Sequence, residues 1–123
     1  MTTKTAAIHQ FLNSFGIPAY PITSVPEDAE MPYITYTLYL NAWGEGEQNI
    51  PIDVWYRTES EAEPNAKVTD ISKAVGMGGK IIACDDGNIW IKRGSPFAQT
   101  VQDTDNTVKR RLINLSIECN TDY

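Results

Sequence analysis

The sequence predicts an α+β fold, a mixed and mostly antiparallel sheet with two helices packed on one face. Three observations favour it. Apolar residues recur at helical spacing in residues 4–15, and they alternate with polar residues in 33–43 and 108–119. The predicted connections between neighbouring strands are too short for parallel crossovers. A length of 123 residues fits one domain, so residues 1–123 are expected to fold as a unit.

The first predicted element is a helix over residues 4–15. Its apolar side chains form one stripe, made of Ala7, Ile8, Phe11, Leu12 and Phe15. Gly16 and Pro18 indicate where it ends. Residues 17–31 follow with three prolines and predict an extended connection.

Two strands, 33–43 and 50–58, are predicted to form a hairpin around Gly44-Glu45-Gly46-Glu47. In the expected register Tyr36 faces Val54, and every apolar side chain lies on one face. The following pairs in that register are Leu38 with Ile52 and Leu40 with Ile50. A shift by two residues would keep the same faces, so the register is left open to that extent.

A second helix is predicted over residues 60–76. Ser60 and Glu63 have the spacing of a capping box, Pro64 is tolerated in the first turn, and Gly76 ends the helix. The expected buried face consists of small and apolar residues, namely Ala62, Ala66, Thr69, Ile71 and Val75.

The remaining residues predict further strands and one long loop. Residues 79–84 and 88–92 flank a tight turn at Asp85-Asp86-Gly87. Residues 95–107 are polar and weakly periodic, which predicts a loop with room for a short strand near Phe97. The final strand directs Ile113, Leu115, Ile117 and Cys119 to one side.

The charge and the apolar content restrict the function classes. Ten basic and 16 acidic side chains give a net charge of −6, which argues against an ordinary nucleic-acid-binding surface. No apolar stretch approaches the roughly 20 residues of a membrane helix, and none resembles a signal peptide. We therefore expect folding in a cytoplasm, where Cys84 and Cys119 would be free core residues.

Two segments have a superficial resemblance to binding motifs. Gly76-Met77-Gly78-Gly79 lacks the Lys-Ser or Lys-Thr of a phosphate loop, and helix termination explains its glycines. Asp103, Asp105 and Asn106 lack the glycine and distal glutamate of a calcium loop.

Titratable residues do not form a reactive constellation either. His9 is expected in solvent without a partner, and Asp85 with Asp86 would point apart in a turn. The basic run Lys109-Arg110-Arg111 would be split between two faces by strand alternation. The sequence thus predicts no catalytic residue, no metal and no cofactor.

Aromatic residues on the outer strand face indicate an interaction surface instead. Tyr33, Thr35, Thr37 and Tyr39 point away from the predicted core, joined by Trp55. Either a helix of this chain or a neighbouring subunit could cover them. Trp43, Glu45 and Glu47 would project at the hairpin tip and contact a partner.

Four sequence segments, which together span nearly the whole chain, resemble one protein family. They are MPYITYTLYL, IPIDVWYRTESEAEPNAKVTDISKAVG, IKRGSPFAQ and DTDNTVKRRLINLSIE. In their order along the chain and in their residues, these segments resemble the tail terminator (tail-completion) family of bacteriophages with long, non-contractile tails. The resemblance implies an α+β subunit of a six-membered ring that stops tail-tube polymerisation and joins the tail to the head. DNA would pass through the ring without specific binding.

The resemblance implies partners and places rather than chemistry. Expected partners are further copies of the chain, the major tail tube protein and a head-completion protein; the location is the head-proximal end of the virion tail, after assembly in the host cytoplasm. The expected interface residues are Tyr33, Thr35, Tyr39, Trp43, Glu45, Glu47, Trp55 and Phe97, and Asp103 and Asp105 are expected to face the channel. The loop from Phe97 to Asp105 would order on docking.

Two other functions remain open. A head-completion or stopper protein of the phage neck would also form rings, but it would bind the portal side rather than tail tubes. A small cytoplasmic enzyme or ligand-binding domain would need a concave apolar pocket with converging polar groups.

Overall fold

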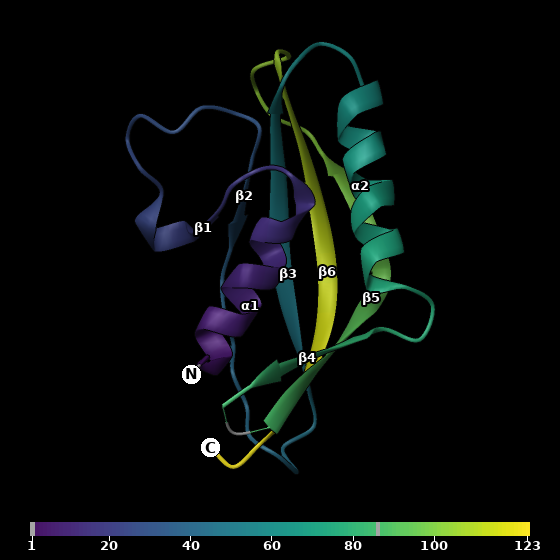
Figure 1. The fold of residues 1–123 in the computed structure, drawn as a ribbon. Helices are drawn as coiled ribbons and strands as arrows, with labels where there is room; N and C mark the ends of the chain where they lie inside the picture. Colours follow the sequence, from purple (N-terminus) through teal and green to yellow (C-terminus); the bar gives the residue numbers. More distant parts are fainter. Residues whose placement is uncertain (1, 86) are drawn as a thin grey trace.

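The structure, a computed structural model, describes residues 2–85 and 87–123 and contains two helices and one six-stranded sheet (Figure 1). The elements are α1 (Lys4–Leu12), η1 (Asn13–Phe15), β1 (Ala19–Pro21), η2 (Ile22–Ser24), β2 (Tyr33–Tyr36), β3 (Glu47–Arg57), α2 (Ala62–Val75), β4 (Lys80–Cys84), β5 (Gly87–Val101) and β6 (Val108–Thr121). The strand order is β1-β2-β3-β6-β5-β4, with β1 parallel to β2 and all other neighbours antiparallel. The predicted fold class is therefore confirmed.

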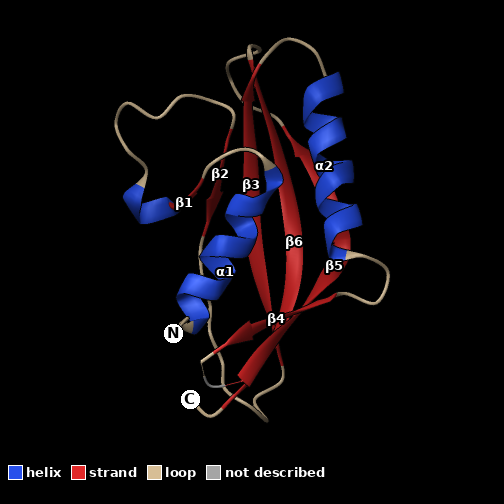
Figure 2. Cartoon of the chain, viewed as in Figure 1, coloured by secondary structure: helices blue, strands red, loops and turns tan. Residues whose placement is uncertain are grey.

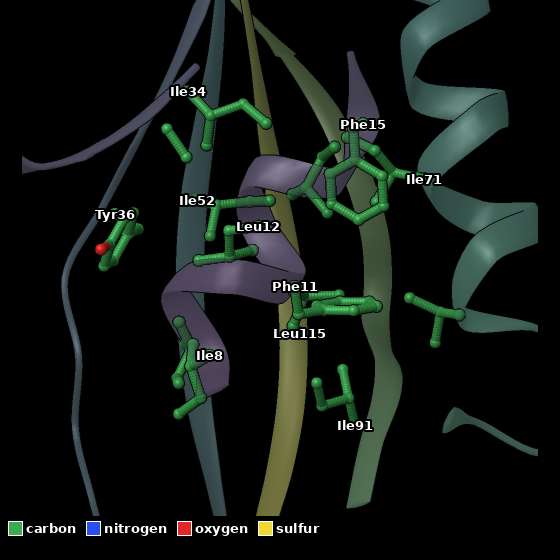
Figure 3. Packing of buried hydrophobic residues seen from close by; sticks show 14 of the residues in the cluster. Ile8, Phe11, Leu12, Phe15, Ile34, Tyr36, Ile52, Ile71, Ile91 and Leu115 are labelled. Carbon is green, nitrogen blue, oxygen red and sulfur yellow. The ribbon is translucent and has the colours of Figure 1, made fainter. Parts of the chain in front are cut away.

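Both helices pack on the same face of this sheet and enclose the core (Figures 2 and 3). Alternate residues of the central strands point toward them, among them Ile34, Ile52, Val54, Ile91, Ile113 and Leu115. Leu12 of α1 and Ile71 of α2 reach the same cluster from the other side. Burial of each such side chain stabilises the fold by roughly 1.5–3 kcal/mol.

The first helix is confirmed in extent and in its buried stripe. Thr3 Oγ1 accepts a hydrogen bond from the N–H of Ala6 at 3.1 Å, which caps the start of α1. η1 extends the helical path to Phe15, and Gly16 then takes a φ of 86°, a left-handed conformation that favours glycine. His9 is half-buried rather than exposed, since its Nδ1 lies 2.5 Å from Oη of Tyr36.

The predicted hairpin is shorter than expected and shifted by two residues. Tyr36 pairs with Ile52, and β2 ends there. The next position would set Thr37 opposite Pro51, which has no N–H to donate to a sheet partner. β3 continues from Glu47 beside β6 alone, so residues 37–46 leave the sheet.

The second helix is confirmed, but its cap and buried face differ from the prediction. Ser60 Oγ accepts from the N–H of Ala62 at 3.1 Å, and the N–H of Ser60 donates to Oγ1 of Thr58. The buried positions of α2 are Pro64, Ile71 and Val75, with Val68 half-buried. Ala62, Ala66 and Thr69 are exposed. Larger side chains bury more apolar area, so they set the helix orientation.

The long loop predicted over 95–107 is wrong in its first half, because β5 runs to Val101 beside β6. A bulge between Arg93 and Ala98 interrupts the alternation that marks a strand. Gln99 and Thr100 are exposed, which explains the polar composition. The turn predicted at 85–87 is consistent with the pairing of Cys84 with Gly87; Asp86 lies outside the described residues.

Two further predictions about the interior are confirmed. Cys84 and Cys119 are free, and Cys119 is buried. The basic run in β6 is split between faces: Arg111 points to the helix side and is 4% exposed, whereas Arg110 points to the opposite side. Arg111 bonds Oδ1 of Asn65 and pairs with Glu61, which ties the start of α2 to the sheet.

Candidate interaction surface

The face of the sheet opposite the two helices has no helix over it in the described chain (Figures 1 and 2). We call it the helix-free face. Its side chains come from alternate positions of all six strands: Tyr20, Tyr33, Thr35, Glu47, Asp53, Trp55, Ile81, Trp90, Lys92, Arg110, Leu112 and Ser116. It is a broad surface that combines aromatic rings with charged groups.

A first cluster is centred on Trp55. The indole N–H donates to Oγ1 of Thr35 at 2.9 Å, and the guanidinium carbon of Arg110 lies 4.8 Å from the ring centroid. Nε of Arg110 donates to Oδ1 of Asp53 at 2.8 Å. Each polar group around the ring thus has a partner within the chain, so a partner could cover Trp55 without leaving a charge unpaired.

A second cluster with the same chemistry is centred on Trp90. The indole N–H donates to the carbonyl of Gly78 at 2.9 Å, and Nζ of Lys92 lies 4.1 Å from the ring centroid. Lys92 pairs with Glu47, which also accepts from Oγ of Ser116 at 3.0 Å. Tryptophan is among the residues that are enriched in protein interfaces and in their energetically important positions.

The structure brings several predicted interface residues together on this face. Tyr33 pairs with Trp55 across the strands, and its ring meets that of Tyr20 edge-on at 5.9 Å. Thr35 is buried under the indole of Trp55. Glu47 begins β3 and belongs to the Trp90 cluster rather than to a hairpin tip.

Other predicted interface residues lie elsewhere. Tyr39, Trp43 and Glu45 belong to the segment 37–46 outside the sheet, and Trp43 is 78% exposed. The N–H of Trp43 donates to the carbonyl of Thr121 at 2.9 Å, which fixes this segment beside the end of β6. Phe97 lies in the bulge of β5 and packs against the core, so it does not belong to a loop that orders on docking.

Asp103 and Asp105 lie in the ordered turn between β5 and β6. Oδ1 of Asp103 accepts from the N–H of Asp105 at 3.0 Å, and Oδ1 of Asp105 accepts from the N–H and hydroxyl of Thr107. The hydrogen bonds from Thr107, aided by Arg57, hold the pKa of Asp105 below its ordinary value. Channel exposure of these residues stays a prediction.

This turn belongs to one end of the elongated molecule, which is rich in carboxylates (Figure 1). The loops 58–61 and 102–107 lie side by side there, joined by the hydrogen bond from the N–H of Thr58 to the carbonyl of Thr107, and the loop 25–32 lies at the side of the sheet near this end. The carboxylates in and next to them are Glu27, Asp28, Glu30, Glu59, Glu61, Glu63, Asp103 and Asp105. The opposite end carries exposed Trp43 and Tyr123 together with the exposed carboxylates of Glu45, Asp85 and Asp122.

Sequence reasoning missed Asp53, Trp90 and Lys92 as members of this surface. The available signal was the period of two: Trp90 and Lys92 alternate with buried Ile89 and Ile91. Their proximity to Glu47 and Ser116 depends on strand order, which no local pattern encodes.

Hollows in the surface are shallow and mixed in lining. One of about 320 Å³ is lined by residues that include Ile22, Tyr36 and Leu38. Burial raises the pKa of the Tyr36 hydroxyl there. Within residues 2–85 and 87–123 no three His, Cys, Asp or Glu side chains are grouped as metal ligands would be. In the same residues no helix has the length and apolarity to cross a membrane.

No protein-family model matches the chain, and no curated protein matches it.

Proposed function

We propose that this chain is a structural subunit of a long-tailed bacteriophage, a tail terminator without catalytic activity. About six copies would form a ring on the end of the tail tube, stop its polymerisation and provide the surface that joins the head. The observation that supports this proposal is the helix-free face, on which Trp55 and Trp90 each lie beside an ion pair of the same chain.

The physical argument concerns the cost of covering such a face. A subunit interface removes water from the residues it covers, and an unpaired charge there destabilises the complex. Arg110 and Lys92 already have carboxylate partners, so burying the two indoles under another subunit costs less electrostatic free energy than it would beside unpaired cations. Buried aromatic rings supply much of the binding free energy in protein interfaces.

The charge distribution supports the passage of DNA. The chain has a net charge of −6, and eight carboxylates lie at or beside one end. Negative potential repels the phosphates of DNA. A channel lined by that end would let DNA slide through without binding it. In the virion, a ring with the proposed role would lie at the head-proximal end of the tail, after assembly in the host cytoplasm.

The decisive experiment adds the purified protein to the polymerising tail tube protein of the same phage. We expect shorter tubes that end in a ring when they are imaged by electron microscopy, and the variant Trp55→Lys should reduce this capping. Met77→Lys, at a loop residue that is 95% exposed, is the matched control. Thermal unfolding of both variants separates a lost contact from a lost fold.

Unchanged tube lengths at saturating protein would overturn the proposal. Binding to the portal side of filled heads instead would favour the neck-protein alternative. Light scattering of the free protein adds the mass of any ring formed without the tube.

A further inference from the structure

Residues 38–40 follow β2 along the chain but have no strand partner. Leu38 packs against the core, whereas Tyr39 is 50% and Leu40 40% exposed. In the described chain, none of the backbone hydrogen bonds outside helices and strands involves the N–H or C=O of these three residues. An extended segment with free backbone groups can pair with the edge of another sheet.

Pro51 explains why this segment is not paired within its own chain. It lies on β3 at the point where β2 would continue, and it lacks the N–H that the continued ladder would need. Lys4 Nζ donates to the carbonyl of Asn41 at 3.0 Å, which holds the end of the segment near α1. The segment is therefore positioned by contacts on either side while its own backbone stays free.

The sheet offers one edge that is open to such a strand. β1 has only three residues and contains Pro21, and the part of β5 beyond β4 carries a bulge and Pro96. Prolines, bulges and short length protect edges against pairing. β4 has five residues with neither proline nor bulge, and β5 is its only strand partner. The segment before α1 borders only the end of this edge, where the N–H of Asp85 donates to the carbonyl of Thr2 at 2.7 Å. Its Ile81 is 65% exposed.

We propose that residues 38–40 of one copy add as a strand to the outer edge of β4 in the next copy. Both the donor segment and the acceptor edge belong to this chain, so the strand that binds the β4 edge comes from a second copy. The donor follows β2 near one side of the sheet, and the acceptor is the opposite edge. Each copy then gives one strand and receives one, a head-to-tail contact that closes into a ring when the rotation allows. Ring closure rests on the proposed function, but the strand addition does not.

Cross-linking between separately made cysteine variants tests the contact directly. Tyr39→Cys and Ile81→Cys would each be made with Cys84→Ala, because Cys84 is itself in β4. Cys119 is 2% exposed and stays in place. A short thiol-specific cross-linker is then added to the mixed variants at high protein concentration. We expect dimers that contain one copy of each variant.

The control mixture replaces Tyr39→Cys with Ala66→Cys, at an exposed position of α2 that does not adjoin residues 38–40. It should give about tenfold less dimer at equal reaction time if the contact is specific. Equal yields from both mixtures, or no dimer from either, would overturn the strand addition.

A second comparison separates backbone pairing from side-chain contact. Leu40→Pro removes an N–H, whereas Leu40→Ser shortens the side chain and keeps it. Neither change breaks a backbone hydrogen bond of the described monomer, so both variants should fold. We expect Leu40→Pro to lower the mixed-dimer yield at least about tenfold below that of Leu40→Ser. Equal yields would mean that the backbone does not pair.

The same variants keep this inference distinct from the proposed function. Efficient cross-linking without capping of tail tubes would retain the strand addition and remove the terminator role. Capping that Leu40→Pro and Leu40→Ser perform equally well would retain the role and remove the strand addition.

Discussion

Arg110 and Arg111 are neighbours in β6, yet they lie on opposite faces of the sheet in different surroundings. Arg111 is buried on the helix side and holds the first turn of α2 through Glu61 and Asn65. Arg110 lies on the helix-free face over Trp55, and its side chain is 33% exposed. The helix side therefore uses its charge to fix the fold, while the other side keeps its charges paired on an accessible surface.

The strongest way to break this contrast is to remove apolar volume from the helix side. Ile52→Ala should lower the free energy of unfolding by about 2–5 kcal/mol, because Ile52 is fully buried between the sheet and α1. Urea unfolding followed by circular dichroism measures it. Ile81→Ala, on the helix-free face, is the control and should change stability by less than about 0.5 kcal/mol. Similar losses from both would contradict the contrast.

The same substitution at each of the two arginines tests whether the two faces of the sheet differ in their contribution to stability. Arg111→Ala should destabilise the fold by about 1–3 kcal/mol, since it removes the buried groups that bond Asn65 and Glu61. Arg110→Ala should cost less than about 1 kcal/mol in the monomer, because its ion pair is partly solvated. Chemical denaturation of both variants gives the difference. A larger loss of unfolding free energy for Arg110→Ala than for Arg111→Ala would mean that the helix-free face contributes more to stability than the helix side.

Lys67 sharpens the comparison within the helix side. Its Nζ donates to the carbonyl of Phe15 at 2.6 Å, so α2 holds the end of η1. Lys67→Met keeps the aliphatic length and should lower stability by about 1 kcal/mol. Thermal unfolding measures it, with Lys73→Met on the exposed side of α2 as the control. No difference between these two variants would rule out the link between helices.

The smallest expected effect is a pH dependence at the acidic end. Asp105 has a folded pKa below its ordinary value because Thr107 donates to its carboxylate. The contribution of the ionised Asp105 carboxylate to the free energy of unfolding is thus complete above its unfolded pKa. It is lost as the pH falls through its folded pKa. Asp105→Asn should be less stable than the parent protein at neutral pH, and the two proteins should become equally stable in acid. Thermal unfolding of both proteins across that pH range checks the sign. A difference in stability that grows as the pH falls would contradict the prediction.

Local patterns in the sequence determined most of the elements. The stripe from Ala7 to Phe15, the alternation from Ile50 to Tyr56 and that from Ile113 to Cys119 each predict their element and its buried side, because the periods of helix and strand are fixed by backbone geometry. The split of Arg110 from Arg111 follows from the same period. These features need no knowledge of neighbouring segments.

Tertiary structure decided what depends on partners distant in the chain. Pro51 ended the ladder beside β2 and freed residues 38–40, and the bulge near Pro96 concealed the second half of β5. The clusters around Trp55 and Trp90 exist only because β6 lies between β3 and β5. Strand order is set by the burial of the whole sheet under two helices, a free energy summed over the entire chain. Local spacing cannot encode that sum, so the pairing of the charges on the helix-free face became visible only in the folded molecule.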